Sequence, residues 1–360
     1  MSRIEASGWR VRGRLLFAGV LVTALAVAAT GCGQEQEAPA SETPAAQVEV
    51  SDVTLYPAQL GRGADTALLH VQEEVIVDGD LRIPVTGPAH LWLMGRIGRG
   101  YLISTASADF EHYSVQLVRR NGERRVLQRF GDRTTATMSA DGSQLALVQL
   151  AWPDTRIRIV LTRSGRLVRE RTFASYGVEV SDYGQTRLVL NGLRGRTHWW
   201  NPVRNRLTLI VPRPAKADIA ADRLVVLVPD PDTPYLDCQR TVRLSRPTQV
   251  LWRSCKNVPL TFSPDASRMV TVDIRADGIG PRTVQVRRAG GKLLATYRAP
   301  MWFGFTEWES NTDLLLQPVG RKYLAAVRCY LADGCERASR LYKSPGTYDP
   351  PETMRWSFPQ

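Results

Sequence analysis

Closely spaced pairs of acidic residues are the feature of this chain that could do chemistry. Two carboxyl groups that face one glycosidic bond can act as general acid and as base or nucleophile, which is how most glycosidases work. Such pairs occur at Asp109 and Glu111, at Asp230 and Asp232, and at Glu307 and Glu309. We expect these pairs to lie near loops, where acidic side chains usually have only a structural role.

Other catalytic motifs are missing from the sequence. It contains no G-x-S-x-G, H-E-x-x-H, Walker A, G-x-G-x-x-G or EF-hand pattern and only four histidines, so nucleophilic and metal catalysis lack their usual donors. The loop from Val228 to Cys238 places Asp230, Asp232 and Asp237 among prolines and could hold a hard cation. An ordinary rigid loop is the reading that we favour, and we expect no catalytic residue, no metal and no cofactor.

Tryptophans are the other residues that could contact a ligand, because an indole ring can stack on a sugar. Packing between structural elements is the more common role of large aromatic rings. This alternative applies to Trp199, Trp200, Trp302 and Trp308. The candidate ligand contacts are Asp230, Asp232, Trp199, Trp200 and Glu307.

Two series of turn sequences indicate which elements position these residues. The first falls at Ile97-Gly98, Asp141, Asp182, Asp222, Asp265 and Ser310, and the second at Gly122, Gly165, Arg204, Pro247, Gly290 and Gly334. Both series repeat at intervals of about 40 to 45 residues, and they stay in phase with each other. A repeat of this length with several strands per unit predicts the blades of a β-propeller.

The strands between the turns have the character that blades require. Apolar runs follow the first turns, as in Gln144–Leu150 and Arg268–Ile274, and predict inner strands packed between blades. The hairpins around the second turns, such as Arg156–Phe173 and Thr283–Arg298, alternate arginine with Val, Ile and Leu, as outer, half-exposed strands do.

The number of blades depends on both ends of the chain. One period before Gly122 lies Asp78-Gly79, a hairpin turn whose strands lack inner partners upstream. The segment Met354–Phe358 could supply those partners, so that strands from both ends close one blade and leave no exposed edge. We therefore predict an all-β fold: a single propeller of seven blades, each with four antiparallel strands, with six blades as the alternative.

The repeated phrase also resembles a known family. Phe262–Ile274, FSPDASRMVTVDI, and Met138–Leu150, MSADGSQLALVQL, look like the repeat of TolB-like, WD-repeat-like propellers, and the chain is similar to actinobacterial lipoproteins of this kind. The resemblance extends from about Leu81 to Lys343, without the Gly-His and Trp-Asp pairs of true WD repeats or an attached hydrolase domain. It implies a propeller fold and a binding role and does not specify a partner.

The N-terminus predicts export and lipidation. A basic region at Arg3–Arg14 precedes Leu15–Ala29, an uncharged run of fifteen residues that is too short for a membrane span of about 20 residues. Ala29-Thr30-Gly31-Cys32 then resembles a bacterial lipobox, whose cysteine carries the lipid; ordinary cleavage after a small residue is the alternative. We expect a signal peptide over residues 1–31, lipidated Cys32 and a tether over 32–50, and the propeller over 51–360.

The other cysteines agree with an oxidising compartment. There are four of them, and they form two pairs around predicted turns. Cys238 and Cys255 are symmetric about Ser245–Thr248, and Cys329 and Cys335 flank Asp333-Gly334. Hairpins at these turns predict the disulfides Cys238–Cys255 and Cys329–Cys335. No short C-x2-C pair is present for zinc.

Positive charge limits the kinds of partner. Removal of residues 1–31 takes away four arginines and one glutamate, so the net charge falls from +12 to +9. Arginines crowd the outer hairpins at positions Arg119, Arg120, Arg124, Arg125, Arg166, Arg169, Arg171, Arg287 and Arg288. They could meet phosphate-bearing wall polymers or anionic lipids, or they could be charges that protect strand edges.

These observations favour a binding protein over an enzyme. We expect a monomer held by its lipid at the extracytoplasmic face of the bacterial cell membrane, with no nucleic acid partner. It would bind a protein or an envelope ligand without catalysis. The alternative is an extracytoplasmic carbohydrate-active enzyme, a glycosidase or lyase, with carboxylates at the channel mouth.

Overall fold

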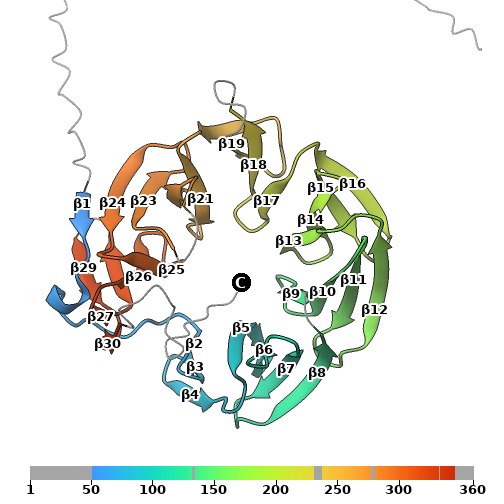
Figure 1. Ribbon diagram of the computed structural model, residues 1–360, viewed down its shortest axis with the longest axis horizontal. Coiled ribbons are helices and arrows are strands. Elements are labelled where there is room, and N and C mark those ends of the chain that lie inside the picture. The colour runs from blue at the N-terminus through green and yellow to red at the C-terminus, as the bar shows by residue number, and fades with distance from the viewer. Residues whose placement is uncertain (1–50, 132–133, 231–236, 277–279, 332, 345–360) are drawn as a thin grey trace, which may run out of the picture. The chain divides into compact units, whose positions relative to one another are not determined.

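Seven separate β-sheets follow one another around a ring (Figure 1). The computed structural model describes residues 51–131, 134–230, 237–276, 280–331 and 333–344, which belong to one unit, Val48–Gln360; a second unit, Met1–Gln47, lies outside them. The seven-bladed propeller is therefore confirmed. Among the described residues, no helix is long and apolar enough to cross a membrane.

The first four complete blades each contain four antiparallel strands in chain order. Blade 1 contains β5 (His90–Ile97), β6 (Gly100–Ala106), β7 (Tyr113–Arg119) and β8 (Arg124–Phe130). Blade 2 contains β9 (Thr134–Met138), β10 (Gln144–Ala151), β11 (Asp154–Leu161) and β12 (Leu167–Phe173). Blade 3 contains β13 (Glu179–Tyr183), β14 (Leu188–Leu193), β15 (Arg196–Asn201) and β16 (Arg206–Val211). Blade 4 contains β17 (Ala215–Asp218), β18 (Arg223–Pro229), β19 (Asp237–Arg243) and β20 (Val250–Ser254).

The remaining blades carry additions or receive strands from the N-terminal part of the chain. Blade 5 contains β21 (Asn257–Phe262), β22 (Arg268–Asp273), β23 (Thr283–Arg288), β24 (Leu293–Arg298) and the added β1 (Ser51–Thr54). Blade 6 contains β25 (Trp302–Trp308), β26 (Asp313–Val319), β28 (Val327–Tyr330), β29 (Gly334–Arg337) and the short β27 (Tyr323–Leu324) and β30 (Tyr342–Lys343). Blade 7 contains β2 (His70–Gln72), β3 (Val75–Asp78) and β4 (Leu81–Pro84). A 3-10 turn, η1 (Pro57–Gln59), lies between β1 and β2.

The repeated turn phrase makes the same hydrogen bonds in two blades. In blade 2 the Asp141 carboxylate accepts the backbone N–H of Ser143 at 3.0 Å, and in blade 5 Asp265 accepts that of Ser267 at 3.0 Å. Each phrase also needs one residue in the left-handed conformation, which is Gly142 with φ 68° in blade 2 and Ala266 with φ 55° in blade 5. Both predicted turn series are confirmed, since they fall at the junctions of the first and second and of the third and fourth strands of blades 1 to 6, with Asp182 near the end of β13 and Gly334 at the start of β29.

The second strands of the blades are the most buried, as their apolar sequences predict. Leu102, Leu145 and Leu314 are completely buried on β6, β10 and β26. Their side chains pack against the neighbouring blade, so the core is divided into clusters that lie between sheets. The outer strands β8 and β12 expose alternating residues, as half-covered strands do.

Closure of the ring differs in detail from the sequence prediction. The hairpin turn at Asp78-Gly79 is confirmed between β3 and β4, but the expectation that its strands lack an inner partner upstream is wrong, because β2 pairs with β3. Blade 7 thus has three described strands, all from the N-terminal part of the chain. The predicted contribution of Met354–Phe358 lies outside the described residues.

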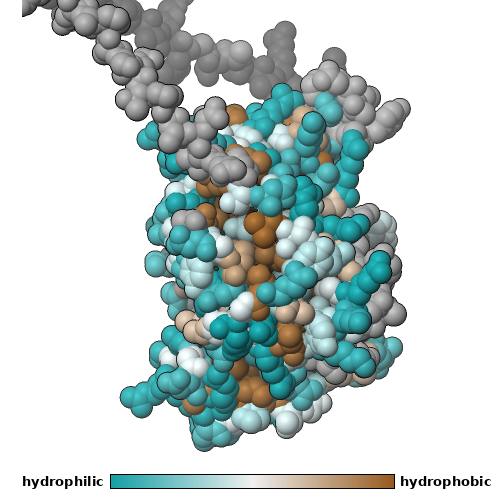
Figure 2. All heavy atoms as spheres, turned by 90° about the vertical axis from the view of Figure 1, so that its left-hand side faces the viewer, coloured by the Kyte–Doolittle hydropathy of each residue, from teal (hydrophilic) through white to brown (hydrophobic). Residues whose placement is uncertain are grey.

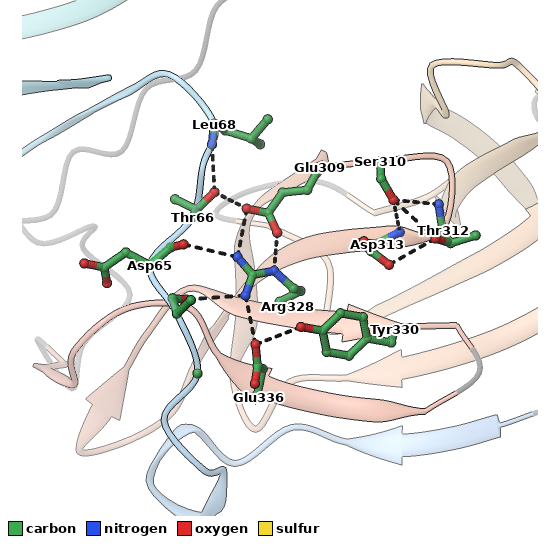
Figure 3. A network of polar contacts seen from close by, with 12 residues as sticks. Asp65, Thr66, Leu68, Glu309, Ser310, Thr312, Asp313, Arg328, Tyr330 and Glu336 are labelled. Carbon is green, nitrogen blue, oxygen red and sulfur yellow. Dashed lines mark hydrogen bonds and ion pairs between the residues drawn. The ribbon is translucent and has the colours of Figure 1, made fainter. Parts of the chain in front are cut away.

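A buried ion-pair cluster holds the N-terminal segment against blade 6 (Figure 3). Arg328 on β28 binds the Glu309 carboxylate through Nε and Nη2, and both side chains are about nine-tenths buried, at 10% and 8% exposure. Arg328 also donates to Glu336 at 2.8 Å and to the Ala64 and Asp65 carbonyls at 3.3 Å. These bonds raise the pKa of the guanidinium, and they join segments more than 260 residues apart.

Removal of Arg328 tests how far the propeller depends on this cluster. We expect Arg328→Ala to lower the free energy of unfolding by about 3–5 kcal/mol, because the buried Glu309 and the half-buried Glu336 would lose their cationic partner. The matched control is Arg340→Ala, which breaks the 2.8 Å pair with Glu73 between exposed side chains and should cost less than about 1 kcal/mol. Urea unfolding of both variants measures the difference, and equal losses would contradict the role given to Arg328.

Candidate functional site

The antiparallel strands of each blade place two kinds of loop at the same end of the ring. Loops from the second to the third strand and from the fourth strand to the next blade emerge together, and we call this end the loop face. The two series of tight turns lie at the opposite end. Residues on the loop face can therefore come from every blade, which is how propellers assemble binding sites.

The largest hollow that we describe, the basic hollow, lies at the rim of the loop face between blades 5 and 6. It has a volume of about 800 Å³. Its wall contains the end of β1 and η1, the ends of β23 and β24, and the loop before β27, with the residues Thr54, Tyr56, Pro57, Ala58, Gln59, Arg282, Thr283, Arg298, Ala299, Pro300, Gly320, Arg321, Lys322 and Tyr323. Four of these side chains are cationic and none is acidic.

Three of the four cations in the basic hollow have no carboxylate partner within the described residues. Arg298 is the exception, because it binds Asp52 through two bonds of 3.0 Å, and this contact lowers the pKa of the Asp52 carboxyl. Among the described residues Arg282 donates to the Pro300 carbonyl at 3.3 Å, and Arg321 and Lys322 are exposed. The hollow therefore has an excess of positive charge that an anion can neutralise.

Two tyrosines complete the basic hollow. Tyr56 is 48% exposed and Tyr323 44% exposed, so each ring offers an apolar face and a hydroxyl to a ligand. Gly320 lies on the floor, where an added Cβ would come within 3.0 Å of the Tyr323 carbonyl and 3.9 Å of Pro300. The backbone turn that positions Arg321 and Lys322 thus leaves no room for a side chain.

The wall beside the basic hollow is mostly hydrophilic. Figure 2 shows the side of the molecule where β1 and the outer strands of blades 5 and 6 lie, with hydrophobic residues gathered in a narrow band between hydrophilic ones. A broad apolar patch, which would favour a hydrophobic partner, is not visible on this side.

The acidic residues that could serve an enzyme do not form a catalytic pair. Asp109 accepts the Glu111 backbone N–H at 3.1 Å inside its own loop, and Glu309 is engaged by Arg328. Glu307 lies on β25, and burial raises its pKa to about 7, against a smaller lowering by the charge of Lys216 on β17. Asp232 lies outside the described residues.

The two adjacent tryptophans have different environments. Trp200 is completely buried and packs edge-on against Phe173, with 5.5 Å between ring centroids; as a ligand contact it is unsuitable, because packing between blades encloses it. Trp199 is half-buried and lies under the Arg187 guanidinium at 3.9 Å. Trp199 lines a hollow of about 280 Å³ with Arg204 and Arg206.

Both predicted disulfides are confirmed. Cys238 and Cys255 are joined with 3.9 Å between Cα atoms, and Cys329 and Cys335 with 4.1 Å, in each case across the predicted hairpin. Asp230 lies near the first pair, with all three potential ligand atoms within 4.8 Å of one another. Because both sulfurs are bonded to each other, they do not offer thiolates to a metal.

The arginines of the outer hairpins mostly contact the protein itself. Arg169 donates to the Pro202 carbonyl at 3.0 Å, and Arg171 donates to Asn205 at 2.9 Å, so both join blade 2 to blade 3. Arg125 likewise donates to the Arg163 carbonyl of the next blade. Sequence reasoning attended to these residues and missed Arg282, Arg321 and Lys322, because only the fold brings those three together.

Comparisons with solved structures found several chains of low sequence identity. The chain is similar to an uncharacterized protein from Listeria monocytogenes EGD-e, at 12% identity and TM-score 0.43 over 79% of this chain and 85% of that one. It is also similar to the β-propeller domain of the Trilobed protease from Pyrococcus furiosus, at 11% identity and TM-score 0.47 over 70% and 86%. TolB from Acinetobacter baumannii matches at 10% identity and TM-score 0.40 over 54% and 50%.

These likenesses concern the fold alone, and the blade count is based on the strand pairing of this chain. No family model and no curated protein matches the sequence. The resemblance to actinobacterial lipoproteins stays a prediction.

The Glu307 carboxyl predicts a pH-dependent stability. Its pKa rises from 4.5 to about 7 on folding, so the folded state holds the proton more tightly and the free energy of unfolding falls as the pH rises from about 4.5 through about 7. Glu307→Gln should therefore stabilise the protein by roughly 2–3 kcal/mol at pH 8 and leave it unchanged at pH 4. Denaturant unfolding at both pH values measures this, with exposed Glu111→Gln as control; a pH-independent difference would contradict the assignment.

Proposed function

We propose that this protein is a lipid-tethered, extracytoplasmic β-propeller that binds a phosphate-bearing component of the cell envelope without converting it. The observation that carries the proposal is the basic hollow, in which Arg282, Arg321 and Lys322 line one space and have no carboxylate partner in the part of the chain that the structure describes. Arginine binds a phosphate through two parallel hydrogen bonds and lysine binds it as a point charge. The three cations therefore suit a ligand with more than one phosphate.

The tyrosines support a polymer or headgroup over a free inorganic ion. Tyr56 and Tyr323 line the same hollow, and their rings can cover the uncharged part of a ligand between its phosphates. With a volume of about 800 Å³ the hollow lies in the upper part of the range for small-molecule sites. The described lining offers guanidinium groups, an ammonium group and two phenol rings, which suit the binding of an anionic ligand.

The tether would keep this hollow close to the membrane. If Cys32 carries a lipid, the 18 residues from Gly33 to Val50 can reach at most about 60 Å. They lead directly into β1, and β1 and η1 line the basic hollow. The two disulfides suit an oxidising compartment.

Charge reversal tests the ligand site. The protein beginning at Gly33 should bind poly(glycerol phosphate) or phosphatidylglycerol vesicles with an affinity that falls as salt rises. Arg321→Glu/Lys322→Glu should weaken binding about tenfold or more. The control, Arg119→Glu/Arg120→Glu, changes the net charge by the same amount, but on blade 1 at the end of the ring opposite the loop face. It should have less than about a third of that effect on affinity.

The two probes separate the two sources of phosphate. Binding of the polymer alone would identify a wall component, and binding of vesicles alone would identify a lipid headgroup. Absence of binding to both, or an equal loss in the control variant, would overturn the proposal.

Lipidation is tested separately with the full chain in a bacterial host. Cys32→Ala should leave the precursor uncleaved by the lipoprotein peptidase or release the protein from the membrane fraction. Immunoblots of membrane and released fractions, with Cys329→Ser as a control that keeps Cys32, measure both outcomes. A Cys32→Ala protein with unchanged size and membrane retention would contradict the lipid anchor.

A further inference from the structure

A second hollow, the channel hollow, opens on the central channel. It has a volume of about 370 Å³ and lies where β5, β9 and β13, the innermost strands of blades 1 to 3, run side by side (Figure 1). Its wall consists of Trp92, Leu93, Met94, Ser104, Tyr113, Thr134, Thr135, Ala136, Thr137, Met138, Val180, Ser181 and Asp182. None of these residues lines the basic hollow, so the two hollows are separate sites.

Hydroxyl groups dominate the polar surface of the channel hollow. Ser104, Tyr113, Thr134, Thr135 and Thr137 all line it. Among the described residues, the Thr134 hydroxyl is buried without any hydrogen-bond partner, and the Thr134 residue is only 9% exposed. A buried hydroxyl without a partner is costly, and a ligand that exchanges a hydrogen bond with it would remove that cost.

An aromatic ring stands beside these hydroxyls. Trp92 is 37% exposed, although it is on an innermost strand, and its centroid lies 5.9 Å from that of His90, with the rings 15° from parallel. Tyr113 lines the same space. A partly exposed indole near the unpaired Thr134 hydroxyl offers apolar stacking and hydrogen bonding within one small site.

Charge distinguishes this site from the basic hollow. Among the described residues no cation lines it, and the one acidic residue among them, Asp182, already accepts the backbone N–H groups of Tyr183 at 2.7 Å and Ile219 at 2.6 Å. A phosphate or carboxylate would find no positive partner here, and a purely apolar ligand would leave Thr134 unpaired. The ligand must therefore be neutral, carry several hydroxyls and have an apolar face.

We propose that the channel hollow binds a sugar ring of a neutral glycan, stacked on Trp92 and hydrogen-bonded to Thr134. A sugar ring has this combination of properties, because its C–H groups form an apolar face and its hydroxyls both donate and accept. The inference does not depend on the basic hollow.

The experiment uses the chain from Gly33 to Gln360, which contains every described strand. Maltotetraose, cellotetraose and chitotetraose are titrated separately, and binding is followed by calorimetry and by tryptophan fluorescence. We expect saturable binding of at least one of them, and we expect a sulfated form of that sugar to bind more weakly, because no cation would meet the sulfate.

Variants locate the site. Trp92→Ala should weaken binding about tenfold or more, whereas Trp152→Ala, which removes an indole that is 80% exposed and does not line the hollow, should leave it unchanged. Thr134→Val keeps the shape of the side chain and removes the hydroxyl. It should weaken binding about fivefold or more while the melting temperature stays equal or rises, since the unpaired buried group is gone.

Each outcome decides the proposal. Failure of all three oligosaccharides to bind at concentrations up to the tens of millimolar overturns it, and so does binding that survives both Trp92→Ala and Thr134→Val. Loss of sugar binding with intact phosphate binding would overturn only this inference, and the converse would overturn only the proposed function.

Discussion

One buried guanidinium joins the two parts of the chain that meet where the ring closes. Blade 6 and blade 7 are neighbours in space, but the Ala64 and Asp65 carbonyls that Arg328 contacts lie 264 and 263 residues before it in the chain. In every other pair of neighbouring blades, the two blades follow each other in the sequence. The loop that connects them therefore holds them side by side. At this junction, the Arg328 cluster and the backbone bonds between Gly63 and Arg337 and between Gly61 and Arg337, at 2.9 and 2.8 Å, take that role.

The same closing segment also builds the candidate site. Strand β1, Ser51–Thr54, pairs in parallel with β24. The chain then passes through Tyr56 and η1 before it reaches the Arg328 cluster, and Tyr56 and η1 form one wall of the basic hollow. The opposite walls come from blades 5 and 6, more than 220 residues later. The segment that closes the ring therefore also forms a wall of the candidate site.

The features that could be predicted from the sequence are those formed by residues close together in the chain. The turn at Asp141 and the hairpin between Cys329 and Cys335 are formed by residues within a few positions of each other, so their types and spacing sufficed for the blades and the disulfides. The parallel pairing of Ser51 with Ala295 leaves no such pattern. Arg282 and Lys322 leave no such pattern either, because each is a single cation in its own loop. They come to line one hollow only when blades 5 and 6 pack together. The burial of Trp200 against Phe173 likewise depends on the neighbouring blade, so the sequence left both packing and ligand contact open for this residue.

The two hollows differ in chemistry because they use different parts of the blades. The basic hollow is built from loops and strand ends at the rim, where solvent lets unpaired cations persist. The channel hollow is built from strand residues, where an unpaired cation would be costly and neutral hydroxyls are tolerated. If both sites bind as proposed, a polymer that alternates neutral sugars with phosphates can occupy them together. The second contact would then be intramolecular, so two weak sites would hold such a polymer much more tightly than either does alone.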